Sequence, residues 1–348
     1  MLKTVLALLV TLPLVTLQGA AATAALSEKE KSEVIEGVAL QLRGLYVESG
    51  ADRKTLEAAI RAKAKQGGYR VLSTGPEFAR ALEADLRRIG RDAHFRVDWY
   101  PDQVPPLPTS FVVTKESLDR QRAPAATGRN NGFPSVARLD GNVGYLEING
   151  IFDADLIKET TAAAMTFVTH TDALIVDLRR ARGGEPNGVA HVLSYFLTER
   201  THVFDMVSVK ERTHFVTDGW LPGPRYDVSK PVFVLTSKDT FSGGESLAYC
   251  LQAFKRARVV GEKTTGGSTA AMPVKLSAHF SAGIPALATF VIATGGNWNN
   301  VGVIPDIEAP GDKARDVAYR LALEHILTID SNPARQERIR ALLEAVRP

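Results

Sequence analysis

The segment "KPVFVLTSKDTFSGGESLAYCLQAFKRARVVGE", residues 230–262, decides the fold. It contains an apolar run that ends near Thr236, a helical pattern that begins after Gly243 and Gly244, and a second apolar run at "ARVVGE". Continuous apolar runs of this length are typical of strands buried on both faces of a parallel sheet. A strand, a helix and a strand in this order predict a βαβ unit.

The same alternation extends from about Val136 onward. Strands are predicted at "GNVGYLEING" and "DALIVDLR", and helices at "DADLIKETTAAAMTFV" and "EPNGVAHVLSYFLT". The fold class is therefore α/β, with a βαβ-type core whose largely parallel sheet is covered by helices on both faces. The segment "VKLSAHFSAGIPALATFVIATGG" alternates and predicts a hairpin or an edge addition. Two helices near 312–328 and 333–346 finish the chain.

The part before this core is helical. Ser27 followed by Glu30 has the form of a capping box, and helical patterns follow at "LSEKEKSEVIEGVALQLRGLYV", "DRKTLEAAIRAKAKQG" and "GPEFARALEADLRRIG". These helices predict a small N-terminal bundle, followed by a strand at "HFRVDWY" and a proline-rich connector. We therefore divide the chain into a signal peptide (1–25), an N-terminal helical domain (26–110) and an α/β core domain (111–348).

The first residues have the layout of a secretory signal peptide. Lys3 precedes an apolar run from Val5 to about Leu17, and small residues follow it. Cleavage is expected between Ala21 and Leu26. A transmembrane anchor is the alternative, but the run is short and contains a proline. We expect a periplasmic or secreted protein with no stable membrane anchor after cleavage.

Composition excludes several classes of function. The net charge is only +3 and basic residues are scattered, so no nucleic acid partner is implied. The seven histidines are dispersed with no two at metal-ligand spacing, so no metal site is expected. Cys250 is the single cysteine, which excludes an internal disulfide, and it is expected to be a small buried apolar residue.

The chemistry is expected beyond the carboxyl ends of the strands, where ligands bind in open α/β sheets. Three loops fall there: "DLRRARGGEPNG", "TSKDTFSGGE" and "GEKTTGGS". Gly183–Gly184 and Gly243–Gly244 precede helices, where free N–H groups favour negative charge and can form an oxyanion hole. In the first loop, Asp177 and Arg179 are expected to brace the backbone by hydrogen bonds and an ion pair.

Ser242 lies in the second of these loops, between the strand that ends near Thr236 and the helix that begins after Gly243 and Gly244. Two interpretations remain open from the residues alone: a nucleophile, or a helix N-cap. A serine nucleophile requires a base to take its proton. Lys263, His94 and the other histidines are candidates, and spacing does not choose among them.

Several segments together resemble the carboxyl-terminal (tail-specific) processing protease family. They are "DLRRARGG", "TFSGGESLAYCLQAFKRARVVGEKTTGGS" and "NWNNVGVIPDIEA", in this order, and the resemblance covers about Leu26 to Pro310. The similarity extends most to the branch that includes the interphotoreceptor retinoid-binding protein and to tricorn-like members. Many tail-specific enzymes carry a PDZ domain before the core. Here the gap after His94 is too short for one.

The resemblance implies roles for individual residues. Ser242 matches the nucleophile, and Gly183 and Gly243 match the glycines whose N–H groups form the oxyanion hole. Gly267 stands where tail-specific enzymes have their catalytic lysine, so the resemblance implies the histidine base of tricorn-like members. His94, in "DAHF", matches that histidine, although it also suits an ordinary half-buried position on a strand.

The remaining positions complete this comparison. Asn299 stands where relatives have a glutamate that positions the histidine, and its amide is expected to orient the His94 imidazole in the same way. Ala181 replaces a frequent asparagine. Gly184, Glu245 and Trp298 are the candidate substrate contacts, although Glu245 also suits a first helical turn and Trp298 also suits a core.

The resemblance implies a serine-type peptidase that needs no cofactor and acts on peptides or unfolded protein chains. The departures at Ala181, Asn299 and Gly267 motivate an alternative from another class. In that alternative, the same fold is a non-catalytic carrier of hydrophobic ligands such as a fatty acid or a retinoid.

Overall fold

The computed structural model describes residues 25–47, 50–107, 115–126 and 129–346. The predicted signal peptide lies outside these ranges except for its last residue. The helices are α1 (Glu28–Leu45), α2 (Arg53–Lys65), α3 (Gly75–Gly90), α4 (Lys115–Ala126), α5 (Ala154–Val168), α6 (Pro186–Leu193), α7 (Gly243–Ala253), α8 (Ala314–Ile329) and α9 (Pro333–Ala345). The strands are β1 (Arg96–Trp99), β2 (Ser135–Leu139), β3 (Val143–Glu147), β4 (Ala173–Asp177), β5 (His202–Val207), β6 (Arg212–Val216), β7 (Val232–Thr236), β8 (Arg258–Gly261), β9 (Thr269–Lys275), β10 (Phe280–Val291) and β11 (Ile307–Glu308).

One sheet, which we call the parallel sheet, has the strand order β11-β8-β7-β4-β3-β2. Its strands from β3 to β11 pair in parallel, and only the β2–β3 pair is antiparallel. The strands β3, β4 and β7 are buried along their whole length, because helices cover both faces. The predicted α/β class and the largely parallel sheet are confirmed.

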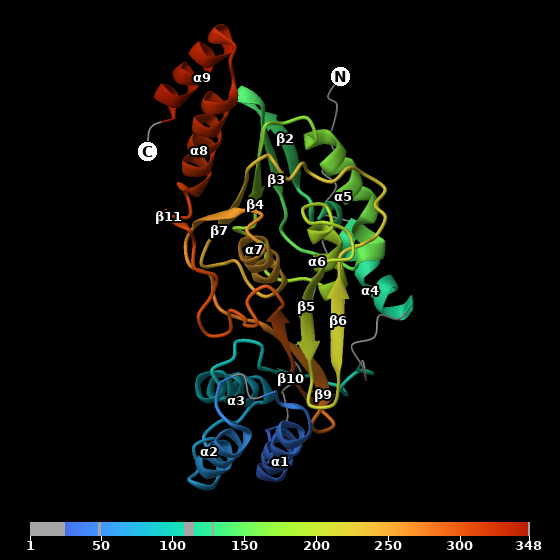
Figure 1. The fold of residues 1–348 in the computed structure, drawn as a ribbon. Helices are drawn as coiled ribbons and strands as arrows, with labels where there is room; N and C mark the ends of the chain where they lie inside the picture. Colours follow the sequence, from blue (N-terminus) through green and yellow to red (C-terminus); the bar gives the residue numbers. More distant parts are fainter. Residues whose placement is uncertain (1–24, 48–49, 108–114, 127–128, 347–348) are drawn as a thin grey trace, which may run out of the picture.

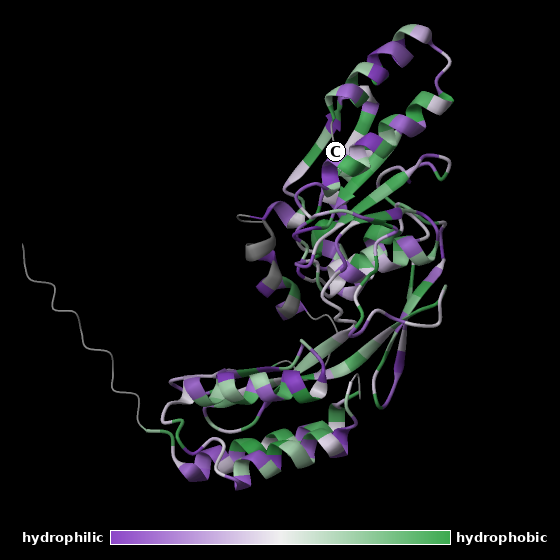
Figure 2. Cartoon of the chain, turned by 90° about the vertical axis from the view of Figure 1, so that its left-hand side faces the viewer, coloured by the Kyte–Doolittle hydropathy of each residue, from purple (hydrophilic) through white to green (hydrophobic). Residues whose placement is uncertain are grey.

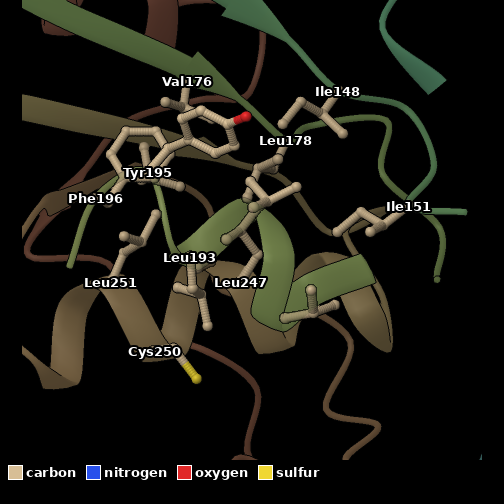
Figure 3. Packing of buried hydrophobic residues seen from close by; sticks show 14 of the residues in the cluster. Ile148, Ile151, Val176, Leu178, Leu193, Tyr195, Phe196, Leu247, Cys250 and Leu251 are labelled. Atoms are coloured by element: carbon tan, nitrogen blue, oxygen red, sulfur yellow. The ribbon is translucent and has the colours of Figure 1, made fainter. Parts of the chain in front are cut away.

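The two faces of the parallel sheet have separate hydrophobic cores. On one face β4 packs with α5, α6 and α7, and Figure 3 shows Leu247, Cys250 and Leu251 of α7 against this core. On the other face, small residues of α8 allow a close approach to β3, β4 and β7. Burial raises the pKa of the Cys250 thiol to about 12, which agrees with its expected role as an apolar core residue.

A second sheet, which we call the antiparallel sheet, lies below the first in Figure 1. Its strand order is β1-β10-β5-β6, and β9 also pairs with β10. The β9–β10 pairing confirms the predicted hairpin. The sequence pattern did not reveal β5 and β6. Every residue of β6 is at least partly exposed, which leaves this edge strand without a buried apolar face to detect.

The N-terminal helices pack on this antiparallel sheet. Ser27 Oγ accepts a hydrogen bond from the Glu30 N–H at 3.2 Å, so α1 begins at the predicted cap. Buried residues of α1, α2 and α3 share one core with Phe280, Ala282 and Ile284 of β10. Figure 2 shows hydrophilic and hydrophobic residues mixed along these helices, as expected for helices with one buried side. The helical part therefore rests on β10, a strand that comes much later in the chain.

No helix in the described part of the chain is both long and apolar enough to span a lipid bilayer.

Candidate active site

Ser242 lies in a strained turn between β7 and α7. Its backbone has φ 52° and ψ −117°, and such a conformation costs a residue with a Cβ about 1–3 kcal/mol. The turn is held because the Ser242 N–H donates to Glu245 Oε2 at 2.8 Å and the Ser246 N–H donates to the Ser242 carbonyl at 2.8 Å. The Ser242 side chain is half-buried. Strain at a strand-to-helix turn is typical of exposed serine nucleophiles, so this geometry favours the nucleophile over a simple cap.

The structure brings His94 to this serine. His94 Nε2 lies 3.2 Å from Ser242 Oγ, although 148 residues separate them. The imidazole comes from the turn before β1 and stacks on Phe241, with ring centroids 4.7 Å apart. Its side chain is only 12% exposed. The distance is within the range over which a base takes a proton through a hydrogen bond.

Two residues that the sequence pattern did not single out hold the other side of the ring. His94 Nδ1 lies 2.9 Å from Thr269 Oγ1 and 3.2 Å from Asp92 Oδ1. Thr269 Oγ1 in turn donates to Asp92 Oδ2 at 2.8 Å. Because the threonine hydroxyl gives its proton to the carboxylate, its oxygen is free to accept from His94 Nδ1–H. That tautomer leaves Nε2 unprotonated and facing Ser242.

Asp92 is well placed to orient the His94 ring. Its side chain is fully buried, and its Oδ1 also accepts from the His94 N–H at 2.8 Å, which closes a tight turn. The Asp-x-His spacing in "RDAHF" was a usable signal, because aspartate often bonds the backbone two residues ahead. Thr269 gave no such signal, since only the fold places β9 beside this turn.

The glycines expected at the oxyanion hole also meet here. A Cβ built on Gly183 would lie 3.9 Å from Ser242 Cβ, and one on Gly243 would lie 2.6 Å from the Gly184 nitrogen. Gly183 has φ 151°, a conformation that side chains rarely allow. Within the described residues, neither the Gly183 nor the Gly243 N–H donates a hydrogen bond to the protein. Two free donors beside the serine suit an oxyanion.

Glu245 holds the backbone around Ser242 through hydrogen bonds. It is completely buried and accepts hydrogen bonds from Ser242 N–H, Gly266 N–H at 2.6 Å, Gly267 N–H at 2.9 Å and Thr264 Oγ1 at 2.5 Å. Burial raises the pKa of its carboxyl above the ordinary value, although these donors oppose the rise. A residue with no exposed surface cannot contact a substrate, so the prediction of Glu245 as a substrate contact is corrected. Its carboxylate instead joins the turn of Ser242 to the loop of Gly266 and Gly267.

The surroundings of Gly267 leave no space for a lysine side chain at this position. A Cβ at this position would lie 2.4 Å from Phe241 Cε2 and 2.7 Å from His94 Cε1. The space that a lysine would need is therefore filled by the imidazole and by the ring on which it stacks. Lys263, the other lysine candidate, is exposed and makes no hydrogen bond to Ser242 within the described residues.

Trp298, Asn299 and Gly184, the remaining predicted site residues, make contacts other than those expected of them. Trp298 is 2% exposed and its Nε1 donates to the Gly267 carbonyl at 3.0 Å, so it is a core residue rather than a substrate contact. Asn299 Oδ1 accepts from the Ser268 N–H at 3.0 Å, while Asp92 and Thr269 occupy the His94 nitrogen that Asn299 was expected to hold. Gly184 is exposed and packs against Ile151.

The loop "DLRRARGGEPNG" at the end of β4 is braced by Asp177 and Arg179, as expected. Arg179 forms an ion pair with Asp177 at 2.6 Å and donates to the Gly311 carbonyl at 2.7 Å. Burial opposes ionisation of Asp177, but its hydrogen bonds from Arg179 and Tyr145 outweigh this and hold the pKa of the carboxyl below its ordinary value. Ala181 is buried and its carbonyl accepts from the Phe241 N–H at 2.9 Å, which joins this loop to the turn of Ser242.

Part of the chain is similar to a known protein family. Residues 142–309 match the model of Peptidase family S41. They form a peptidase family S41 domain.

Relatives and solved structures are similar to this chain over different extents. A carboxyl-terminal-processing protease of Synechocystis is 27% identical over 228 residues, covering 63% of this chain and 50% of the relative. A chloroplastic carboxyl-terminal-processing peptidase 2 of Arabidopsis thaliana is 30% identical, covering 53% and 35%. The chain thus spans half the length of these relatives or less.

A candidate peptidase of Parabacteroides merdae has the same fold, with a TM-score of 0.57 at 16% identity over 89% of this chain and 99% of that one. A lipoprotein from Streptococcus agalactiae gives 0.54 at 14%, over 85% and 96%.

The S41 domain contains only part of the site. Ser242, Gly183, Gly243 and Thr269 lie within residues 142–309, whereas His94 and Asp92 precede them. Ser242 and the candidate oxyanion donors thus belong to the S41 domain, and the imidazole is brought to Ser242 by the pairing of β1 with β10.

Proposed function

We propose that this protein is a serine-type peptidase with Ser242 as nucleophile and His94 as general base. The observation that carries the proposal is the hydrogen-bonded chain from Ser242 Oγ to His94 Nε2, and from His94 Nδ1 to Thr269 and Asp92. A nucleophile, a base and a group that orients the base are the parts that acyl transfer requires.

In the first half of the reaction, His94 Nε2 takes the proton from Ser242 Oγ as this oxygen attacks the peptide carbonyl carbon. The negative charge that develops on the carbonyl oxygen is stabilised by the N–H groups of Gly183 and Gly243, the latter at the start of α7. The imidazolium then gives its proton to the leaving amine, the C–N bond breaks, and an acyl group remains on Ser242. Asp92 stabilises the charge on the ring both directly and through Thr269.

In the second half, a water molecule replaces the amine. His94 takes its proton, the hydroxide attacks the acyl carbon, and the oxyanion forms again at the same donors. The proton returns to Ser242 Oγ as the carboxylic acid leaves. Every step uses residues of this chain, and no cofactor is required.

The substrates we propose are peptides or unfolded chain ends that enter between the helical part and the core. This is supported by the relatives, which are carboxyl-terminal-processing proteases. We further propose that the chain is exported through the signal peptide at residues 1–25 and works in the periplasm or outside the cell. The division at residue 110 remains a prediction, and the helical part would supply the base.

Cleavage of a library of quenched fluorescent peptides tests the proposal. Ser242→Ala should abolish turnover, and a serine-directed phosphonate should label the wild-type protein at Ser242 and leave the variant unlabelled. Ser331→Ala, which replaces an exposed serine between α8 and α9, is the matched control and should behave as wild type. Turnover that survives in Ser242→Ala would refute the assignment.

The same labelling experiment addresses the carrier alternative. No observation in the described part of the site supports that alternative, because the residues around Ser242 form a complete hydrogen-bonded set despite the changes at Ala181, Asn299 and Gly267. A protein that binds lipophilic fluorophores tightly, is not labelled by the phosphonate and cleaves no peptide would be a carrier.

A further inference from the structure

A second cluster of chemically active side chains lies on β5 and β6, the edge of the antiparallel sheet. His202 Nε2 lies 2.5 Å from Asp205 Oδ1, and His214 Nδ1 lies 2.6 Å from the same oxygen. Arg212 donates to Asp205 Oδ2 at 2.7 Å. The proposed peptidase mechanism uses none of these residues.

The local backbone is built to gather them. Asp205 and His214 are directly opposite in the β5–β6 pairing, so their side chains share one face. His202 is three residues before Asp205 and would point to the other face of a regular strand. The pairing register shifts between His202 and Phe204, and this irregularity turns His202 to the side of Asp205.

From this geometry we propose that His202, Asp205 and His214 bind a divalent transition metal ion of the zinc class. Two imidazole nitrogens and one carboxylate oxygen, all within 4.8 Å of one another, are a donor set that such ions accept, with water in the remaining position. Ligand atoms around tetrahedral zinc lie about 3.3 Å apart, since each lies about 2 Å from the ion. To admit the ion, each imidazole nitrogen would move less than about 1 Å away from Asp205 Oδ1. The two nitrogens, which lie within 4.8 Å of each other, would take up a similar spacing of about 3.3 Å.

The surroundings support a bound ion. The Asp205 side chain is only 3% exposed, whereas those of His202 and His214 are 38% and 59% exposed, so solvent reaches the site through the histidines. Arg212 holds the oxygen that the metal would not use, and hydrogen bonds of this kind orient carboxylate ligands.

The sequence predicted no metal site because His202 and His214 are twelve positions apart, far from any usual ligand spacing. The antiparallel pairing of β5 with β6 brings the two histidines together in space. The ion would join the exposed edge strand β6 to β5, where each contributes a ligand, and would therefore stabilise the edge of the sheet.

Zinc binding is measured by calorimetric titration of metal-free, tag-free protein in a buffer that does not bind metals. The wild type should take up one equivalent, and both His202→Ala and His214→Ala should weaken binding at least tenfold. His170→Ala, which replaces an exposed histidine outside the cluster, should bind as the wild type does.

A wild type that binds no zinc, or that binds it only as tightly as both cluster variants do, would overturn the proposal. Because His214 is exposed, its replacement should leave folding unchanged, and circular dichroism verifies this before titration. A second test uses the wild type alone: zinc should raise its melting temperature, and a chelator should reverse the rise. Neither readout depends on peptide cleavage, so failure of the peptidase proposal would leave both results interpretable.

Discussion

Replacement of Gly267 by alanine tests the arrangement of the proposed catalytic base with a single methyl group. The added Cβ would lie 2.4 Å from Phe241 Cε2 and 2.7 Å from His94 Cε1, about 1 Å closer than carbon atoms approach at optimal separation. Both rings must therefore shift. The hydrogen bond between His94 Nε2 and Ser242 Oγ is already 3.2 Å long, so a shift of this size breaks it.

The expected loss follows from the step that fails. A positioned general base contributes about 10²- to 10⁴-fold, so kcat/KM for peptide cleavage should fall by that factor, or by about 2.7–5.5 kcal/mol of transition-state stabilisation. The assay is steady-state cleavage of the best peptide found in the library. Overpacking costs about 1–3 kcal/mol of folding stability, which urea denaturation monitors separately.

Gly44→Ala is the matched control for this variant. Gly44 lies on α1, and no other atom lies within 4 Å of the position that an added Cβ would take. Alanine there should leave activity unchanged and stabilise the helix by about 0.5–1 kcal/mol. A Gly267→Ala variant with wild-type kcat/KM would refute the steric argument. It would show either that His94 is not the base or that the two rings adapt without loss.

Three further results are expected. Asp92→Asn should lower kcat/KM about 10²-fold or more while Thr269→Val lowers it less, because the carboxylate carries the charge that stabilises the imidazolium; equal rates for Asp92→Asn and wild type would contradict this. Ser242→Gly should raise the unfolding free energy by about 1 kcal/mol over Ser242→Ala, since glycine relieves the strain at φ 52° and alanine does not; urea titrations of the two inactive variants measure the difference. Asp205→Asn in a chelating buffer should cost about 1–2 kcal/mol at neutral pH, because the pKa of Asp205 is lowered from 3.8 to about 2 in the folded state; this stabilisation is present above pH 3.8 and is lost as pH falls through about 2, where the two proteins should unfold alike.

Much of the parallel sheet could be predicted because its strands are continuous apolar runs between helical patterns. The strand before Ser242 and the helix after it are local features, as is the cap of α1 by Ser27. The strained backbone of Ser242 could not be predicted, since no residue type demands it there. Its cause is the set of hydrogen bonds that Glu245 collects from a loop some twenty residues further along the chain.

Predictions failed where long-range strand pairing decides the contact. His94 was found by resemblance, but Thr269 joins it only because β9 and β1 both pair with β10. In the same way, His202 and His214 meet through the β5–β6 pairing and a register shift that no periodicity in the sequence indicates. The prediction of Glu245 as a substrate contact was wrong because a charged residue in a first helical turn is usually exposed, whereas here four donors make its burial possible.

The pairing of β1 with β10 has a consequence for inhibition. Four residue pairs, from Arg96↔Gly283 to Trp99↔Phe280, fix the strand that follows His94. A molecule that separates these two strands would withdraw the imidazole and leave the serine and its glycines intact. Such an antagonist would need no resemblance to a peptide, because it would act on the pairing of two strands rather than on the serine.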